Sequence, residues 1–159
     1  MPTKQQIDFV RNYAAAAVTA GRVVGLSALV ILSQAAHEGQ WGTSFSVRTR
    51  KNHFGMLAAG SKNAFWDGVS KTQSTASGLW FRVYKTHEAS FEDFASLISR
   101  KYKAAFACAK NPVAYADAIA ASPYISEANG DDRPAYARAL KANAVTIAAV
   151  AKQLNISLT

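Results

Sequence analysis

The chain has 159 residues, of which 50% are hydrophobic, and its 18 Lys and Arg against 10 Asp and Glu give a net charge of +8. This length fits a single domain, residues 1–159, that can bury its own core, and the composition excludes a disordered chain. A single cysteine, Cys108, excludes an intrachain disulfide and a Cys-rich zinc site, and we expect it to be a small core residue.

The excess of positive charge favours a polyanionic partner, such as nucleic acid, anionic lipid or an acidic cell wall. No run of 18 apolar residues is present, so we expect no membrane insertion. The opening residues 1–6 do not have the pattern of a signal peptide. We therefore expect synthesis in the cytoplasm without a general export signal.

Two helices are expected at the start of the chain. Thr3 and Gln6 form the pattern of a capping box, and the apolar spacing behind them predicts a helix that ends near Gly21. Ser27 is the expected N-cap of a second helix, over residues 28–38. Apolar residues occupy much of the circumference of this second helix, which predicts that it is buried.

The next segment, 39–77, is rich in polar residues and glycine and is expected to be irregular. Residues 79–84 favour a β-strand, and we expect them to form a hairpin with residues 69–75. The turn of this hairpin is expected near Gly78.

Three more helices are expected in the second half of the chain. Ser90, with Asp93 three positions later, is the predicted cap of a helix that runs to about residue 102. Asn111 precedes a proline, as is typical of a helix start, and this helix is expected to end before residue 123. Asp132 is the predicted cap of a last helix, which runs to about residue 154. The sum is an α+β domain, mostly helical, with a small hairpin.

The buried second helix ends in a glutamate, Glu38, which conflicts with its apolar surroundings. The negative end of the helix dipole and burial both disfavour a carboxylate there, so both raise its pKa. A raised pKa suits a general acid near neutral pH, although a capping glutamate would fit the same position. Trp41 and the segment 52–56 then supply aromatic and amide groups for a cleft.

Three segments in order resemble glycoside hydrolase family 73, the peptidoglycan β-N-acetylglucosaminidases. Residues 34–42, QAAHEGQWG, resemble its AQAALESGWG motif, and residues 52–56, NHFGM, resemble its NNLFGIK element. Residues 81–94 resemble its FRxYxSxxESFxDY segment. The resemblance covers roughly residues 5–150 and implies a lysozyme-like fold with a small β-hairpin beside the cleft.

This resemblance implies that Glu38 is the general acid. Most glycosidases need a second carboxylate, which the family often carries in a TxE element of the hairpin. Residues 71–77 contain no acid, so Asp67 is the nearest replacement, although it also fits a turn, and Glu88 is another that fits a helix start. The alternatives are the 2-acetamido group of the substrate, a loop residue that enters on binding, or water activated by weaker groups.

The resemblance also implies a catalytic tyrosine near the last helix. Tyr124, in Ser-Pro-Tyr, is the first choice, and Tyr136, in Pro-Ala-Tyr-Ala, is the second. Either hydroxyl would stabilise the oxocarbenium-like state or orient the acetamido group. A tyrosine of the core fits either position equally well.

Sugar rings stack on aromatic side chains, so we expect a few of the aromatic residues to line the cleft. The residues expected to bind the glycan are Trp41, Asn52, His53, Phe54 and Trp66.

The remaining polar residues support simpler expectations. His37 is expected to be a packed or surface residue and His87 a surface residue. No two histidines have a metal-ligand spacing, so neither a metal nor a cofactor is predicted. A basic cluster in the irregular segment fits a solvated loop or a contact with the stem-peptide carboxylates of peptidoglycan; its members are Arg48, Arg50, Lys51 and Lys62.

The resemblance implies an enzyme that cleaves the glycan strand of peptidoglycan after N-acetylglucosamine, and we expect it to be a monomer. The alternatives are a muramidase or lytic transglycosylase, and a non-catalytic wall-binding module. A nucleic-acid binder is disfavoured because no motif of that class is visible.

A wall hydrolase without a signal peptide needs another route to its substrate. The chain resembles the small antibacterial effectors of the type VI secretion system, which act in the periplasm of a rival cell, and a phage endolysin is the alternative. An effector implies an immunity protein, acidic and periplasmic, that covers the cleft.

Overall fold

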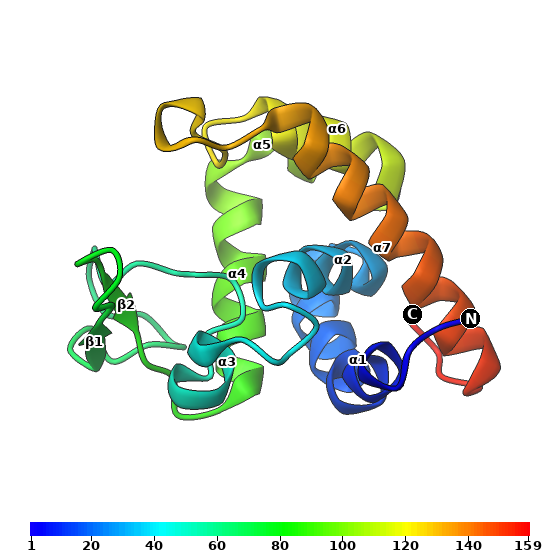
Figure 1. Ribbon diagram of the computed structural model, residues 1–159, viewed down its shortest axis with the longest axis horizontal. Coiled ribbons are helices and arrows are strands. Elements are labelled where there is room, and N and C mark those ends of the chain that lie inside the picture. Colours follow the sequence, from blue (N-terminus) through cyan, green and yellow to red (C-terminus); the bar gives the residue numbers. More distant parts are fainter.

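The computed structural model describes all 159 residues and shows helices packed around a single apolar core, with a two-stranded hairpin projecting to one side (Figure 1). The core contains 30 buried residues drawn from both halves of the sequence. No helix has the length and apolar character needed to cross a membrane. The elements are α1 (Lys4–Val24), α2 (Ala28–Glu38), α3 (Phe45–Arg50), β1 (Lys71–Gln73), β2 (Trp80–Arg82), α4 (His87–Lys101), α5 (Lys103–Phe106), α6 (Pro112–Ala121), the 3-10 turn η1 (Glu127–Asn129) and α7 (Arg133–Gln153).

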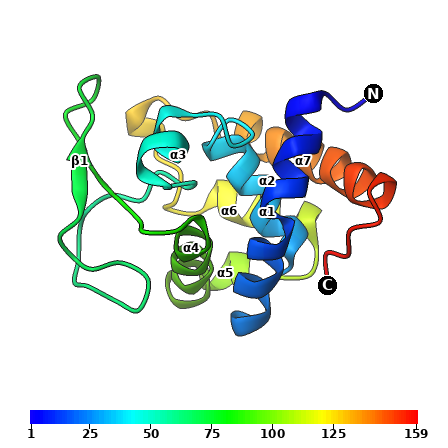
Figure 2. The same ribbon diagram turned by 90° about the horizontal axis from the view of Figure 1, so that it is seen from below.

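The first two helices begin where the sequence predicts. The capping box at the start of α1 is present in both directions: Thr3 accepts from the Gln6 amide, and the Gln6 side chain accepts from the Thr3 amide. Ser27 caps α2 by accepting from the Leu29 amide. Eight of the 11 residues of α2 are buried, and α2 packs against α1, α6 and α7, as Figure 2 shows from below. The helix therefore presents its last residue from the interior of the domain.

The predicted start of the third long helix, α4, is wrong. Thr86 caps it by accepting from the Ala89 amide, so the helix begins one turn before Ser90. Ser90 is fully buried and accepts a hydrogen bond from the His53 amide. Asp93 is also fully buried and binds the hairpin. Both side chains therefore contact residues that are distant in the sequence, and the local pattern does not show these contacts.

The segment expected to be irregular contains one helix, α3, and α5 was not predicted either. Ser44 caps α3 by accepting from the Val47 amide. The hairpin is present but short, and Thr72 pairs with Phe81 in an antiparallel register. Its turn includes Gly78, as predicted, and Leu57 forms an isolated bridge to Phe81.

A buried ionic cluster joins the hairpin to α4. Asp93 accepts from Nη1 of Arg82 at 2.6 Å, from the Tyr84 hydroxyl and from Nδ2 of Asn63 at 2.8 Å. Arg82 also donates to the carbonyl oxygens of the neighbouring loop, at residues 57 and 59. Because one carboxylate receives three donors, this cluster fixes the hairpin and the loop relative to the helix.

The last two long helices have the predicted caps. Asn111 caps α6, and Asp132 caps α7 by accepting from the Ala135 amide. The first residue of α7, Arg133, donates to the carbonyl oxygens of residues 120, 122 and 125 and to the carboxylate of Glu127. Arg133 therefore holds the loop between α6 and α7 against the start of α7. Cys108 is partly buried against the core and is a free thiol.

Candidate active site

The carboxyl group of Glu38 lies at the end of α2, at the wall of a cleft of about 730 Å³. Burial raises the pKa of Glu38 from its ordinary value of 4.5 to about 7. A hydrogen bond from Tyr136 opposes this shift, and the negative charge of Asp131 adds to it. About half of the Glu38 side chains therefore carry a proton at pH 7, whereas an ordinary glutamate carries almost none.

Tyr136 is the direct partner of this carboxyl group. It is buried in the first turn of α7, and its hydroxyl donates to Oε1 of Glu38 at 2.8 Å. Because Oε1 already accepts a hydrogen bond from Tyr136, the acidic proton is more stable on the other oxygen, Oε2. The contact thus orients the group as a proton donor.

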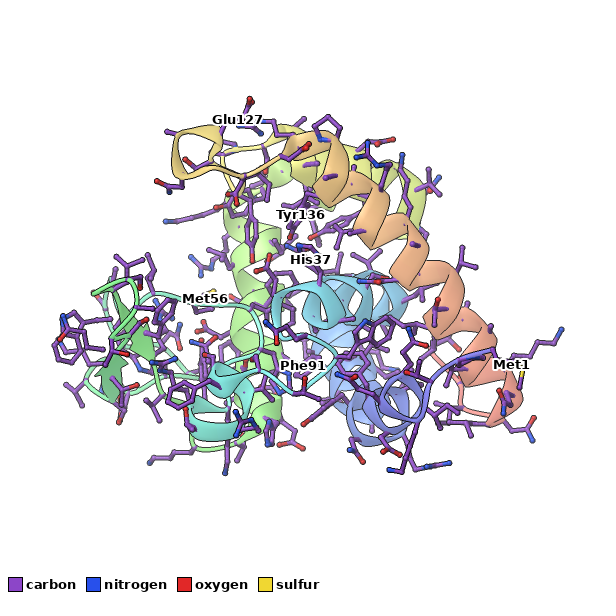
Figure 3. The ribbon with its side chains drawn as sticks, viewed as in Figure 1. Met1, His37, Met56, Phe91, Glu127 and Tyr136 are labelled. Atoms are coloured by element: carbon purple, nitrogen blue, oxygen red, sulfur yellow. The ribbon has the colours of Figure 1, made fainter.

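The cleft lies between two parts of the molecule. One side is formed by the end of α2 and the start of α7, and the other by residues 54–57 and the hairpin; α4 and the α6–α7 loop complete it. In Figure 3, His37 and Tyr136 lie between Met56 and the loop that carries Glu127. The predicted hairpin beside the cleft is therefore confirmed, with Leu79 and Phe81 among the lining residues.

Tyr124 lies in the same cleft wall. Its hydroxyl is 3.5 Å from the carbonyl oxygen of Phe54, and burial together with the charge of Glu38 raises its pKa well above 10.0. Behind it, Tyr115 donates to Oε1 of Gln34 at 2.7 Å, while Nε2 of Gln34 is buried without a partner. The structure thus brings both predicted tyrosines to the cleft, and Tyr136 is the one that contacts Glu38.

Phe54 is the one predicted glycan-binding residue that lines this cleft. Its ring stacks on Phe94 with centroids 3.8 Å apart. Asn52 lies behind the cleft, where its amide donates to the carbonyl oxygens of Met56 and Arg82 and accepts from the Met56 amide. Asn52 therefore shapes the floor, and the structure corrects its expected contact with sugar.

Trp41 and Trp66 do not lie in the cleft of Glu38, which corrects the prediction. Trp41 borders a separate cavity, where it packs edge-on against Phe9. Trp66 is only 4% exposed, and its indole N–H donates to the Ser70 carbonyl under the guanidinium of Arg82. Both rings pack within the fold, whereas the sequence predicted that they bind substrate.

Asp67 is the turn aspartate, the simpler of its two interpretations. It is exposed, and it accepts from the amides of Val69 and Ser70 and from the Ser70 hydroxyl. These bonds lower its pKa to about 2. Asp67 borders a different cavity from that of Glu38, so the structure does not place it as the second acid.

Asp131 is the residue that sequence reasoning missed. Besides Glu38 it is the only carboxylate that lines the cleft, and it is held by a hydrogen bond from the Ser126 amide to Oδ2. The only signal in the sequence was its position directly before Asp132, the cap of α7. Its charge acts on both neighbours at the end of α2, raising the pKa of Glu38 and opposing the desolvation that lowers the pKa of His37.

The three histidines have different environments. His37 is exposed, as expected, and its ring packs edge-on against Tyr136 with centroids 4.7 Å apart. His53 is fully buried, and its Nε2 is 2.8 Å from Nδ1 of His87. Burial and His87 lower the pKa of His53 to about 3. The expected sugar contact of His53 is therefore corrected to a contact with His87, which is itself half-buried and not a freely exposed surface residue.

Replacing Tyr136 tests the geometry around Glu38 directly. Because the hydroxyl lowers the pKa of the carboxyl group, Tyr136→Phe is expected to raise that pKa above 7, by roughly one unit. The measurement is a carbon-13 NMR titration of the Glu38 side chain in both proteins. An unchanged or lower value in the variant would contradict the hydrogen bond.

One family model matches most of the chain. The model of the glucosaminidase family, described as mannosyl-glycoprotein endo-beta-N-acetylglucosaminidase, matches residues 14–149. No curated protein matches the sequence.

Solved structures share the fold over nearly their whole length. A type VI secretion system effector–immunity complex from Pseudomonas protegens matches with a TM-score of 0.71 and 23% identity, over 93% of this chain and 94% of that one. The glycoside hydrolase domain of FlgJ from Salmonella typhimurium matches with a TM-score of 0.71 and 24% identity, over 94% of this chain and 92% of that domain. A peptidoglycan hydrolase from Sphingomonas sp. A1 matches with a TM-score of 0.66 and 24% identity, over 91% of this chain and 94% of that one. The predicted fold, α+β and lysozyme-like, is confirmed.

Proposed function

Because the chain belongs to the glucosaminidase family, and is therefore a glycoside hydrolase, we propose that it cleaves the glycan strand of peptidoglycan after N-acetylglucosamine. The observation that carries this proposal is the carboxyl group of Glu38, which lines an open cleft, accepts from Tyr136 and has a pKa raised to about 7. The names of two similar structures, a FlgJ glycoside hydrolase domain and a peptidoglycan hydrolase, support the choice of substrate.

In this proposal Glu38 is the general acid. The proton on Oε2 passes to the glycosidic oxygen as the bond to the anomeric carbon breaks, and Tyr136 stabilises the carboxylate that forms by donating to Oε1. Positive charge develops on the sugar ring in the same step. We infer that the hydroxyl of Tyr124, which lines the same cleft, contacts the ring or its acetamido group.

We infer that Asp131 supplies the second carboxylate, as the base that activates water. Asp131→Asn is then expected to lower kcat about 100-fold, because general base catalysis contributes factors of this size. It should also lower the pKa of Glu38, since the charge of Asp131 raises that pKa. The measurement is kcat against pH on soluble glycan strands.

The matched control is Asp117→Asn, which removes an exposed carboxylate on α6 that pairs only with Lys141. If Asp131→Asn retains the rate of this control, Asp131 is not the base, and the acetamido group of the substrate, a loop residue that enters on binding, or water activated by weaker groups takes its place.

The bond cleaved is tested by mass spectrometry of the products from purified peptidoglycan. Reducing-end N-acetylglucosamine is the expected product. Reducing-end or anhydro N-acetylmuramic acid would replace the proposal with a muramidase or a lytic transglycosylase. No cleavage at all would favour a wall-binding module.

We further propose that the protein is an antibacterial effector delivered to the periplasm of a rival cell. The support is its similarity, over nearly the full length of both chains, to the effector–immunity complex. Expression directed to the periplasm of a naive host should lyse the cells, whereas cytoplasmic expression and periplasmic Glu38→Gln should not. Harmless periplasmic expression of the active protein would contradict a toxin. The net charge of +8 favours an acidic immunity protein as the partner.

A further inference from the structure

A second cavity continues the cleft of Glu38 along α4. It has a volume of about 460 Å³ and lies between residues 56–63, Arg82 and the last turns of α4. The two hollows adjoin because four residues line both, namely Met56, Leu57, Leu97 and Lys101. Figure 1 shows α4 between the hairpin and α2. The residues that line the extension come from α4, from Arg82 of β2 and from the loop before the hairpin, and none comes from α2 or α7. A polymer bound in the cleft therefore has a second surface beside it.

This extension has positive charges that no protein group neutralises. Lys62, Arg100 and Lys101 line it, all three are exposed, and none takes part in an ion pair. The one hydrogen bond of the Arg100 guanidinium runs from Nε to the Ser96 hydroxyl, so its terminal nitrogens are free. Arg82 differs, since all its nitrogens are used by Asp93 and by loop carbonyls. No acidic residue lines the cavity.

We propose that this basic groove, defined by Lys62, Arg100 and Lys101, binds the carboxylates of the peptide stems that branch from the glycan strand. The inference rests on the proposed function and extends it to the substrate form that the enzyme prefers. A free guanidinium fork matches a carboxylate with two parallel hydrogen bonds, and flanking lysines add attraction at longer range. Lys101 borders both cavities, so a stem attached to a sugar in the cleft passes directly into the groove.

The position of the groove predicts which kinetic constant it controls. The groove is separate from Glu38 and Tyr136, so a stem bound there contributes equally to the ground state and the transition state. Such binding lowers KM and leaves kcat unchanged. Because the lysines and the arginine are exposed, the effect should also weaken as salt is raised.

The test compares two substrates and two double variants. The substrates are soluble strands with intact stems and the same strands stripped by an amidase, which keep only the lactyl carboxylate. Lys62→Gln with Arg100→Gln, at two positions that line the groove but not the cleft of Glu38, is expected to raise KM on intact strands about tenfold, and less than twofold on stripped strands, at unchanged kcat. The control is Lys110→Gln with Lys152→Gln, which removes the same charge from exposed, unpaired positions outside both cavities. It should behave as wild type on both substrates.

Equal losses on intact and stripped strands would assign the groove to the lactyl carboxylate or to the strand itself, and would overturn the proposal. Unchanged KM on intact strands would overturn it as well. A binding assay with the Glu38→Gln protein separates this outcome from failure of the proposed function. Tighter sedimentation with intact than with stripped strands supports the groove even where no bond is cut, and equal binding to both contradicts it.

Discussion

Glu38→Gln is expected to abolish hydrolysis of peptidoglycan, with kcat reduced about 1,000-fold or more. Glutamine has nearly the same shape and keeps an oxygen that accepts from Tyr136, but it has no proton to give to the leaving oxygen. The measurement is release of soluble fragments from purified walls by both proteins at pH 6. For the same reason, the wild-type rate should fall as pH rises above about 7, because the acid form of Glu38 is lost there.

The control for this substitution is its effect on stability. The pKa of Glu38 is raised from 4.5 to about 7 in the folded protein, so the fold holds a proton that the unfolded chain releases over this range. Wild-type stability should therefore fall as pH rises from about 4.5 to 7, by on the order of 3 kcal/mol for a shift of this size. Glu38→Gln should lack this dependence. A variant that is inactive and also less stable than wild type at pH 7 would indicate misfolding, and residual activity above one tenth would exclude Glu38 as the acid.

The helices could be predicted from the sequence because their signals are local. Thr3, Ser27, Asn111 and Asp132 each cap the helix that follows, through contacts within three residues. The position of Glu38 at the end of a buried helix also follows from apolar spacing alone. Its raised pKa could therefore be inferred before any tertiary contact was known.

The rest of the site depends on contacts between distant parts of the chain. The loop with Asp131 reaches the cleft because Arg133 folds it against α7, and no local pattern indicates this. Trp41 and Trp66 are of the residue type that stacks on sugar rings, yet Trp41 packs against Phe9 of α1 and the indole of Trp66 donates to the Ser70 carbonyl. An aromatic residue in an irregular segment fits both uses, and only the fold distinguishes them.

Asp93 is a residue of the fold whose role also depends on contacts between distant parts of the chain. Its sequence context suggested a helix-capping pair with Ser90, whereas the folded chain buries it completely beneath the hairpin. A carboxylate without exposure must be paired, and Arg82, which is 11% exposed, supplies the charge. The wall of the cleft on the hairpin side therefore depends on one buried ion pair.

Asp93→Asn is expected to destabilise the protein by about 3–5 kcal/mol, because it leaves the guanidinium of Arg82 buried without a counter-charge. The measurement is urea unfolding, compared with Asp117→Asn, which breaks an exposed pair with Lys141 and should cost less than about 1 kcal/mol. A second variant, Arg82→Met with Asp93→Asn, removes the unpaired charge while the asparagine oxygen can still accept from Tyr84 and Asn63, and it should recover part of the loss. If Asp93→Asn costs no more than the exposed control, or if the double variant is less stable still, the buried pair does not hold the hairpin. Since Leu57 and Phe81 line the cleft next to this pair, the single variant should also raise KM at temperatures where it remains folded.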